Sequence, residues 1–374
     1  MKILLLGEYS NVHNTLAEGL RALGHQVTVA SDGDSWKNYP RDINLERRKG
    51  KIGGISLVAK LYSLLPSWRG YDVVQLINPI FVELKAERLF AIYHYLRQHN
   101  KCVILGAYGM DYYWVHTCSH EKPLRYSDFN IGDKVRTDAD AIKEQRDWLG
   151  TPKGVLNQLI AVDCDAVITA LYEYHVCYQP KFPTKTHFIP LPIKMPESTD
   201  IHIQDDGKLR FFIGISKNRS EYKGTDIMLK AAQNIQTKYP DRVKLNIAEG
   251  VPFAQYQQLL NGSDAILDQL YSYTPAMNAL LAMSKGIINI GGGEPESYEL
   301  LKETQLHPII NVQPTYESVY DALEQLVLHP ECIDKLKQQS MEYVRRHHDY
   351  LKVAKEYVNI YNKVLTRRDY LLQH

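Results

Sequence analysis

The sequence has almost no net charge and few cysteines. Among its 374 residues, 44 Lys and Arg stand against 43 Asp and Glu, which leaves a formal charge of +1. That balance gives no bulk attraction to nucleic acid or to an anionic membrane, so a charged ligand must be held by a local site. The five cysteines are odd in number and irregularly spaced. This argues against a disulfide framework and predicts a reducing, cytoplasmic location.

Long apolar runs are also lacking. No stretch approaches the roughly 20 apolar residues that a membrane-spanning helix needs. The run Ile3–Leu6 is too short for the core of a secretory signal and is followed at once by Gly7 and Glu8. We therefore expect neither a membrane span nor a signal peptide.

The first turn lacks the glycines of a dinucleotide-binding loop. The run Lys2–Leu6 predicts a strand, and Gly-Glu-Tyr-Ser-Asn-Val-His-Asn follows it with a single glycine. A nicotinamide oxidoreductase is therefore a weak alternative, because its phosphate loop needs Gly-x-Gly-x-x-Gly. The polar side chains of this turn suit a polyhydroxylated sugar better.

Short apolar runs alternate with helical patterns in both halves of the chain. This alternation predicts an α/β fold with doubly wound parallel sheets, covered by helices on both faces. The predicted strands are 2–6, 26–30, 72–77, 103–105, 166–169, 209–213, 243–248, 265–268, 287–290 and 308–312. The predicted helices are 14–23, 87–98, 155–162, 225–238, 252–260, 275–284 and 297–302, followed by a helical tail from about residue 316.

A proline-rich and then polar stretch separates the two halves. FIPLPIKMPE ends at residue 197, and residues 198–207 are polar and acidic. The composition predicts a linker between an N-terminal domain of residues 1–195 and a C-terminal domain of residues 205–346, with an amphipathic helix over 347–374. Ligands of such sheets bind beyond the carboxyl ends of the strands.

Candidate chemistry gathers at three strand ends of the second half. Lys217, Arg219 and Lys223 follow one strand just before a helix, where cations can bind a diphosphate, although a solvated basic loop explains them equally well. Gly-Gly-Gly-Glu-Pro-Glu at 291–296 follows another strand, and its glycines would let a ligand approach the backbone. Asp268 ends the strand between them.

These segments, in this order, resemble the retaining glycosyltransferases of the GT-B fold, the family 4 or "group 1" type. The resemblance covers nearly the whole chain. It rests on Lys-Gly-Thr-Asp at 223–226, Tyr256 and Asp264 separated by seven residues, Ala-Met-Ser-Lys-Gly-Ile-Ile at 282–288 and Gly-Gly-Glu-Pro-Glu at 292–296. It implies two Rossmann-like domains facing across a cleft, with the C-terminal helix crossing back to the first domain.

The resemblance also implies roles for individual residues. The donor diphosphate would be held by Lys223 with Arg219 or Lys217. The donor nucleotide and sugar would contact Glu249, Asp268, Tyr273, Gly292, Gly293, Glu294 and Glu296. The acceptor side would comprise Glu8, Asn11, His13, Asn14, Tyr112, Trp114 and Glu173. The reacting centre would lie near Asp111 and Tyr108. No metal is implied if these cations neutralise the diphosphate, and no cofactor is implied because the nucleotide-diphosphate sugar is itself a substrate.

Two departures from the family pattern stand out. Tyr273 and Leu281 occupy the positions of two glutamates separated by seven residues, and Tyr108 replaces the histidine of His-Gly-x-Asp. We predict an altered site rather than lost activity, because the surrounding segments are full length and rich in polar groups.

The segment after Tyr108 is rich in aromatic residues. Tyr112, Tyr113, Trp114 and Tyr126 suit stacking on sugar rings, although aromatic packing within a loop explains them equally well. His116, Cys118 and His120 would share one face of a strand and suggest zinc, but no fourth ligand follows, so we predict no metal site.

The expected function is transfer of a sugar, with retention, from a nucleotide-diphosphate sugar to a glycan or glycolipid acceptor in surface polysaccharide or glycolipid synthesis. The alternatives are a sugar-nucleotide 2-epimerase and a catalytically degenerate nucleotide-sugar or glycan-binding protein. Nucleic acid is not an expected partner. The basic residues of the tail favour either peripheral contact with an anionic membrane at its inner face or a solvated helix surface; they are Arg345, Arg346, Arg367 and Arg368.

Overall fold

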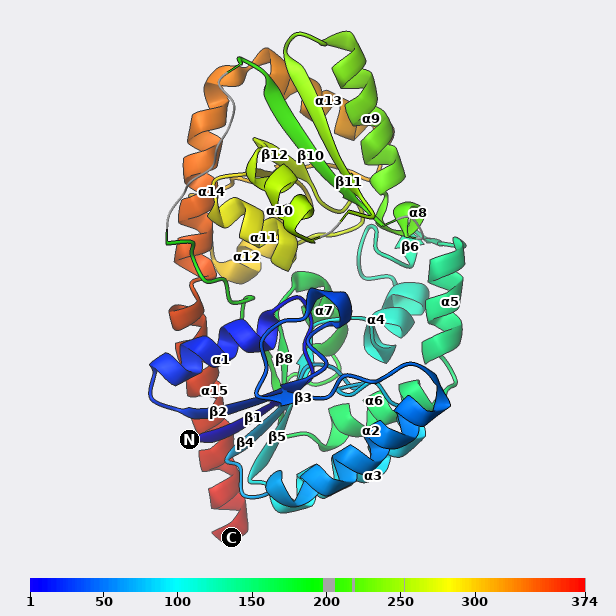
Figure 1. The fold of residues 1–374 in the computed structure, drawn as a ribbon, viewed down its shortest axis with the longest axis vertical. Helices are drawn as coiled ribbons and strands as arrows, with labels where there is room; N and C mark the ends of the chain where they lie inside the picture. The colour runs from blue at the N-terminus through cyan, green and yellow to red at the C-terminus, as the bar shows by residue number, and fades with distance from the viewer. Residues whose placement is uncertain (198–205, 217–218, 252, 374) are drawn as a thin grey trace. The chain divides into compact units, whose positions relative to one another are not determined.

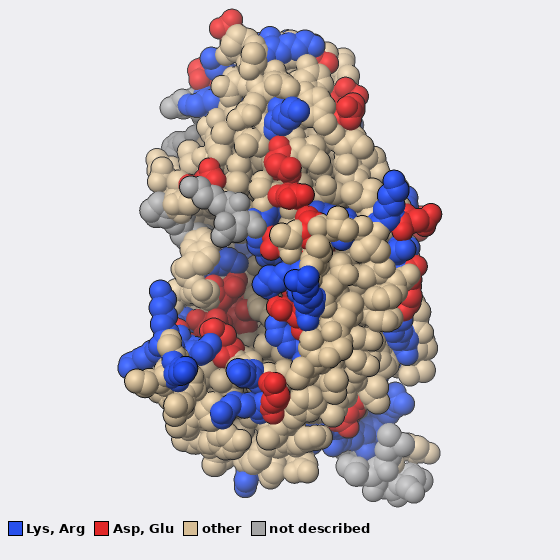
Figure 2. Space-filling view, turned by 90° about the vertical axis from the view of Figure 1, so that its right-hand side faces the viewer, with Lys and Arg blue, Asp and Glu red and all other residues tan. Residues whose placement is uncertain are grey.

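The computed structural model describes residues 1–197, 206–216, 219–251 and 253–373, which form two compact units, each built on its own parallel sheet (Figure 1). Unit 1 comprises Met1–Thr117, Glu144–Pro192 and Tyr350–His374, and unit 2 comprises Cys118–Lys143 and Ile193–Asp349. Within the described ranges, no helix combines the length and the apolar character needed to cross a membrane. Lys and Arg side chains are mixed with Asp and Glu over the face shown in Figure 2.

Unit 1 contains a seven-stranded parallel sheet in the order β3-β2-β1-β4-β5-β8-β9. Its strands are β1 (Lys2–Leu6), β2 (Gln26–Ser31), β3 (Ile43–Asn44), β4 (Val73–Leu76), β5 (Cys102–Ala107), β8 (Ala166–Thr169) and β9 (Thr186–Phe188). The described helices of this unit include α1 (Val12–Ala22), α2 (Gly50–Leu64), α3 (Ala86–His99), α4 (Tyr112–His116), α6 (Pro152–Asp163), α7 (Tyr172–Tyr178) and α15 (Tyr350–Gln373).

Side-chain alternation along the strands assigns residues to the two faces of this sheet. Ile3 and Leu5 point to the face covered by α1 and α15, which share one apolar core with them. The two helices lie side by side in Figure 1 and pack closely. At Gly19 of α1, a Cβ would sit 2.7 Å from the carbonyl oxygen of Tyr350, so this contact requires glycine.

Unit 2 contains a five-stranded parallel sheet in the order β11-β10-β12-β13-β14. Its strands are β10 (Leu209–Ile215), β11 (Val243–Glu249), β12 (Ala265–Leu267), β13 (Ile288–Gly291) and β14 (Ile310–Asn311). On one face lie α9 (Thr225–Lys238) and α13 (Tyr316–Leu328), and on the other α10 (Phe253–Asn261) and α11 (Met277–Ser284). Two more helices are α12 (Pro295–Leu301) and α14 (Ile333–His347).

The segment 118–143 belongs to unit 2, although it follows β5 and α4 of unit 1 along the chain. It contains a small antiparallel pair, β6 (Asn130–Ile131) and β7 (Lys134–Val135). The predicted N-terminal domain of residues 1–195 is therefore interrupted. The tail divides at residue 350, since α14 lies in unit 2 and α15 in unit 1.

The sequence patterns located most strands and helices to within a few residues. They missed the strands β3, β6, β7 and β9 and the helices α2, α4, α5 (Ala139–Trp148), α7 and α8 (Ser220–Lys223). Residues 112–121 are helical, so the prediction that His116, Cys118 and His120 share one face of a strand is wrong. The predicted linker lies partly outside the described residues.

Candidate functional site

The carboxyl ends of three neighbouring strands of unit 2 are joined by direct backbone contacts. The N–H of Leu270, after β12, donates to the carbonyl of Lys223, which follows β10, over 3.0 Å. The N–H of Glu294, after β13, donates to the carbonyl of Tyr273 over 3.1 Å. The loops that carry the expected donor residues therefore form one continuous edge.

Lys223 and Asp268 lie close enough to influence each other's charge. Lys223 ends α8 (Ser220–Lys223), a short helix between β10 and α9. Burial raises the pKa of Asp268, and the positive charge of Lys223 opposes that rise. Arg219 precedes α8, with its guanidinium 4.8 Å from the centre of the Tyr222 ring. Lys217 lies outside the described residues.

Glu249 ends β11, the edge strand beside β10, and is exposed. It pairs in register with Ile215 at the end of β10. Its side chain therefore starts from the same edge of the sheet as the Lys223 loop.

The glycines after β13 have a structural reason that the sequence analysis did not foresee. A Cβ on Gly292 would sit 2.1 Å from the carbonyl oxygen of Ser272, and a Cβ on Gly293 would sit 2.6 Å from Ile309. The close approach at these positions is that of the chain's own loop and side chains. Packing within the chain therefore requires glycine at these two positions, and their place beside a ligand stays a prediction.

Glu294 is almost fully buried, with 3% of its surface exposed, and is held by residues from the 118–143 segment. Its Oε1 accepts hydrogen bonds from the Tyr126 hydroxyl at 2.5 Å and from Gln313 at 2.8 Å. Its Oε2 accepts one from Arg125 at 2.6 Å. Arg125 also forms a two-bond ion pair with Glu296.

Tyr273 completes this cluster. Its hydroxyl oxygen accepts the backbone N–H of Arg125 over 2.7 Å, and its ring lies 5.0 Å from the Arg125 guanidinium and 4.9 Å from the Tyr126 ring. We refer to Arg125, Tyr126, Tyr273, Glu294 and Glu296 as the Arg125 cluster.

The electrostatics of the cluster keep both carboxylates ionised. Burial alone would raise the pKa of Glu294, but hydrogen bonds from Tyr126 and Gln313 and the charge of Arg125 outweigh it and leave the pKa lowered. The hydrogen bond from Arg125 lowers the pKa of Glu296. Burial raises the pKa of Tyr273 to about 12, so its hydroxyl stays neutral at physiological pH.

A second arginine of the same segment braces the Lys223 loop. Arg136 donates to the carbonyls of Glu221 and Tyr222 at 3.0 and 3.1 Å, near the end of α8. Its guanidinium lies 3.8 Å from the centre of the Tyr271 ring. Sequence reasoning missed Arg125 and Arg136, because nothing in their local pattern indicates that this segment belongs to unit 2. It grouped Tyr126 with Tyr112, Tyr113 and Trp114 as aromatics suited to stacking on sugar rings, whereas the structure places Tyr126 beside Glu294.

Asn289 in β13 is a further residue that sequence reasoning missed. It is fully buried, and neither its amide nitrogen nor its amide oxygen has a hydrogen-bond partner among the described residues. Its Nδ2 lies 3.8 Å from the place that a Cβ on Gly291 would occupy, at the carboxyl end of the strand. Buried amides without partners are uncommon and costly.

In unit 1 the turn after β1 uses its own carboxylate to hold the start of α1. Glu8 is buried and accepts the backbone N–H groups of His13 at 3.1 Å and Asn14 at 2.8 Å. Asn11 accepts a hydrogen bond from the Asn14 side chain at 3.0 Å. In a dinucleotide-binding turn, free N–H groups at the start of the helix bind a phosphate. Here the N–H groups of His13 and Asn14 donate to the Glu8 side chain instead.

His13 leads from this turn into a buried polar network. Its Nδ1 lies 2.8 Å from the Gly7 carbonyl and must donate to it, so Nε2 accepts from Gln75 at 3.1 Å. Burial lowers the pKa of His13 to about 3. The Tyr108 hydroxyl is 2.6 Å from that of Tyr357 in α15, so it links β5 to the C-terminal helix.

Asp111 is fully buried at the start of α4. Its Oδ1 accepts the Trp114 N–H at 2.8 Å and its Oδ2 accepts the Tyr178 hydroxyl at 2.7 Å. Burial raises the pKa of Asp111 to about 7, against these hydrogen bonds.

The remaining acceptor-side residues pack near α4. Trp114 is buried and lies 5.2 Å from the Tyr174 ring, and Tyr112 stacks on His116 at 5.2 Å. Glu173 is buried in the first turn of α7. Glu8, His13, Trp114 and Glu173 thus help to form the interior of unit 1.

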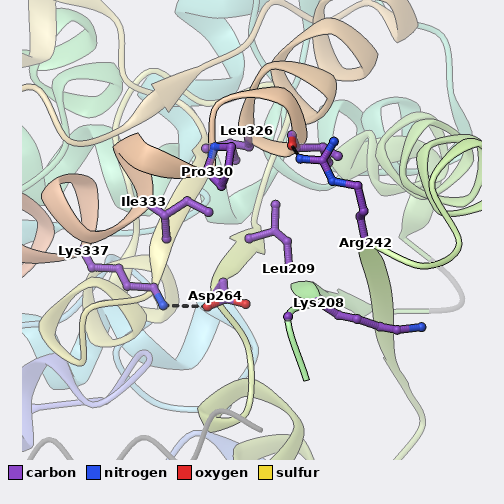
Figure 3. Close-up of a pocket in the computed structure, with 10 residues that line it drawn as sticks. Lys208, Leu209, Arg242, Asp264, Leu326, Pro330, Ile333 and Lys337 are labelled. Carbon is purple, nitrogen blue, oxygen red and sulfur yellow. Dashed lines mark hydrogen bonds and ion pairs between the residues drawn. The ribbon is translucent and has the colours of Figure 1, made fainter. Parts of the chain in front are cut away.

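A hollow of about 450 Å³ lies elsewhere in unit 2. Figure 3 shows Leu209, Leu326 and Ile333 around it, with Lys337 pointing to Asp264 over 2.6 Å. Leu209 begins β10, so the hollow is at the amino ends of the strands, away from the edge where doubly wound sheets bind ligands. Within the described ranges, no three His, Cys, Asp or Glu side chains gather into a metal site.

Comparison with known proteins gives likeness in structure alone. No protein-family model and no curated protein sequence matches the chain. Sucrose-phosphate synthase from Thermosynechococcus elongatus is similar with a TM-score of 0.63 at 12% identity, over 98% of this chain and 100% of that one. The chain has the GT-B fold.

Two further similar structures carry nucleotides. The catalytic domain of starch synthase IV from Arabidopsis thaliana, bound to ADP and acarbose, matches with a TM-score of 0.58 at 10% identity, over 98% of this chain and 99% of that one. The UDP-GlcNAc 2-epimerase from Neisseria meningitidis, bound to UDP-GlcNAc, matches with a TM-score of 0.54 at 13% identity, over 97% of this chain and 100% of that one.

Proposed function

We propose that the chain is a glycosyltransferase that binds a nucleotide-diphosphate sugar at the carboxyl edge of the second sheet. The sugar passes, with retention, to a saccharide or lipid-linked saccharide acceptor. The observation that carries the proposal is the continuous edge formed by the Lys223, Asp268 and Glu294 loops. Open α/β sheets bind ligands at this edge, and structures of the same fold carry ADP or UDP-GlcNAc.

The proposed chemistry is electrostatic. Lys223, with Arg219 or Lys217, stabilises the negative charge that grows on the departing diphosphate. Glu249, Asp268, Tyr273, Gly292, Gly293, Glu294 and Glu296 surround the nucleotide and sugar. Asp111 and Tyr108 lie on the acceptor side, where Asp111 is fully buried and burial raises its pKa to about 7. The assignment to surface polysaccharide or glycolipid assembly at the inner face of a membrane rests on the sequence resemblance.

A thermal-shift screen against UDP, GDP, their common sugars and NAD tests the donor class. Ligands that bind the folded state raise the melting temperature, so we expect one nucleotide-diphosphate series to raise it and NAD to leave it unchanged. A shift with NAD alone would overturn the proposal.

The diphosphate role is tested by Lys223→Ala with Lys230→Ala as a control. Lys230 is an exposed lysine of the adjacent helix α9. We expect the first variant to slow turnover at least 100-fold, as removal of a charge-stabilising group does, and the control to keep normal turnover. Near-normal turnover in Lys223→Ala would contradict the assignment.

A sugar-nucleotide 2-epimerase is the second candidate, and the likeness to the Neisseria meningitidis enzyme favours it. The two functions differ in whether an acceptor is needed. Incubation with the donor alone isomerises the donor sugar in the second case and leaves its configuration unchanged in the first.

A further inference from the structure

The Arg125 cluster is a built polar site at the edge where the proposed donor binds. Its two carboxylates lie after β13, at the start of α12, and its cation comes from the distant segment 118–143. Glu294 and Tyr273 are buried at 3% and 1% exposure, whereas the Arg125 side chain is 53% exposed and that of Glu296 is 26% exposed. The cluster therefore has a buried part, Glu294 and Tyr273, and a charged exposed part, Arg125 and Glu296, that a ligand can reach.

Hydrogen-bonding capacity remains on the exposed side. A guanidinium has five N–H donors, and Arg125 uses three of them on Glu294 and Glu296. The described part of the chain supplies no acceptor for the remaining two, on Nε and Nη1. Free N–H donors beside a carboxylate match the hydroxyls of a sugar, because each hydroxyl both donates and accepts.

The charges of the cluster do not cancel. One guanidinium stands against two carboxylates, and both tyrosines are neutral, so the sum is −1. The charges that act most strongly on Arg125 and Glu296 are those of the cluster itself. Because the cluster has a net negative charge, a ligand group with a negative charge would be repelled by this surface.

We infer that the Arg125 cluster is a sugar-recognition subsite that accepts a donor sugar without negative charge and rejects an acidic one such as a hexuronate. Arg125 and Glu296 determine this specificity. The inference rests on the proposed function, because it needs the nucleotide sugar to bind at this edge.

Calorimetry with matched pairs of nucleotide sugars tests the inference. The pairs are UDP-glucose with UDP-glucuronate and GDP-mannose with GDP-mannuronate, which differ only in oxidation at the sugar's C6, with UDP and GDP as references. We expect the uncharged member of the binding pair to bind at least tenfold more tightly than the acidic member.

Glu296→Gln identifies the source of the discrimination. Glutamine keeps an acceptor for Arg125 and brings the cluster to zero net charge, so the ratio of affinities should fall at least threefold. Glu299→Gln is the matched control, since Glu299 is an exposed residue of the same helix and should leave the ratio unchanged.

The outcomes separate this inference from the proposed function. Equal or tighter binding of the acidic sugar overturns the inference and leaves the proposed function standing. The inference is also overturned if Glu296→Gln discriminates as strongly as the wild-type protein. Failure of every nucleotide and nucleotide sugar to bind overturns the proposed function and the inference with it.

Discussion

Tyr126 donates its phenolic hydrogen to Glu294 Oε1 over 2.5 Å, which joins a hairpin segment to a buried carboxylate 168 positions later in the chain. This bond and those of Arg125 and Gln313 keep a buried carboxylate ionised. Each partner therefore contributes to the stability of unit 2 and to the charge of the edge beside β13.

Tyr126→Phe should destabilise the protein by about 1–3 kcal/mol, because it removes one donor from a buried charged acceptor. The pKa of Glu294 should rise as well. Urea unfolding at pH 7 measures the free energy of unfolding. Tyr62→Phe, at an exposed site in α2, is the control and should change little. If Tyr126→Phe lowers the free energy of unfolding as little as the control does, the hydrogen bonds from Gln313 and Arg125 are enough to stabilise the buried Glu294 carboxylate.

Gly292→Ala should cost at least about 2 kcal/mol, since the new Cβ would meet the Ser272 carbonyl oxygen at 2.1 Å and the backbone must move. Gly54→Ala in α2 should instead stabilise by about 0.5–1 kcal/mol, because its Cβ meets only the flexible Arg47 side chain at 3.5 Å. Thermal unfolding of both variants compares them. Two changes of the same sign would contradict the prediction.

Asn289→Leu should leave stability unchanged or raise it by about 1 kcal/mol, because a buried amide without partners is replaced by an apolar group of similar shape. Asn130→Leu is the matched change in the same unit. Asn130 bonds Leu124, Gly132 and Ser127, so its replacement should cost about 2 kcal/mol or more. A loss above 1 kcal/mol in Asn289→Leu would mean that this amide has a partner in solution.

The stability of unit 1 should fall as the pH rises from 6.5 to 8. Burial raises the pKa of Glu8 to about 8, so the folded state keeps a proton that the unfolded chain releases near pH 4.5. One such group lowers the free energy of unfolding by up to about 1.4 kcal/mol per pH unit in this window. Asp111, with its pKa raised to about 7, also lowers the free energy of unfolding as the pH rises, up to about pH 7. His13, with its pKa lowered by burial, raises the free energy of unfolding with pH only below its ordinary pKa of 6.5, outside this window.

Glu8→Gln should make that slope shallower, because it removes the titrating group. Urea unfolding at several values between pH 6.5 and 8 measures the slope, and Glu46→Gln, at an exposed position, serves as the reference. If Glu8→Gln and the wild-type protein lose stability equally, Glu8 titrates below this window.

Most of the fold follows from local patterns. The helix at 225–238 was predicted with its observed limits, because its apolar spacing, the preceding glycine and the terminal lysine agree. The strands that precede Lys223, Asp268 and Glu294 were predicted from their short apolar runs. Periodicity does not reveal which unit a segment belongs to, so the place of Arg125, Tyr126 and Arg136 in unit 2 could not be predicted. Periodicity also could not reveal that the Glu8 side chain accepts the N–H groups at the start of α1, because that depends on the rotamer of one side chain.

The division of the chain at residues 118, 144, 193 and 350 has a consequence for modular exchange. A chimeric protein made by a single recombination near residue 193 would take Glu294 and Glu296 from one parent and Arg125 and Tyr126 from the other. Such a chimera keeps a buried carboxylate in unit 2 while its counterion comes from a foreign sequence. Grafting the second half onto another GT-B protein must therefore carry residues 118–143 along with it, or replace Arg125 and Glu294 together.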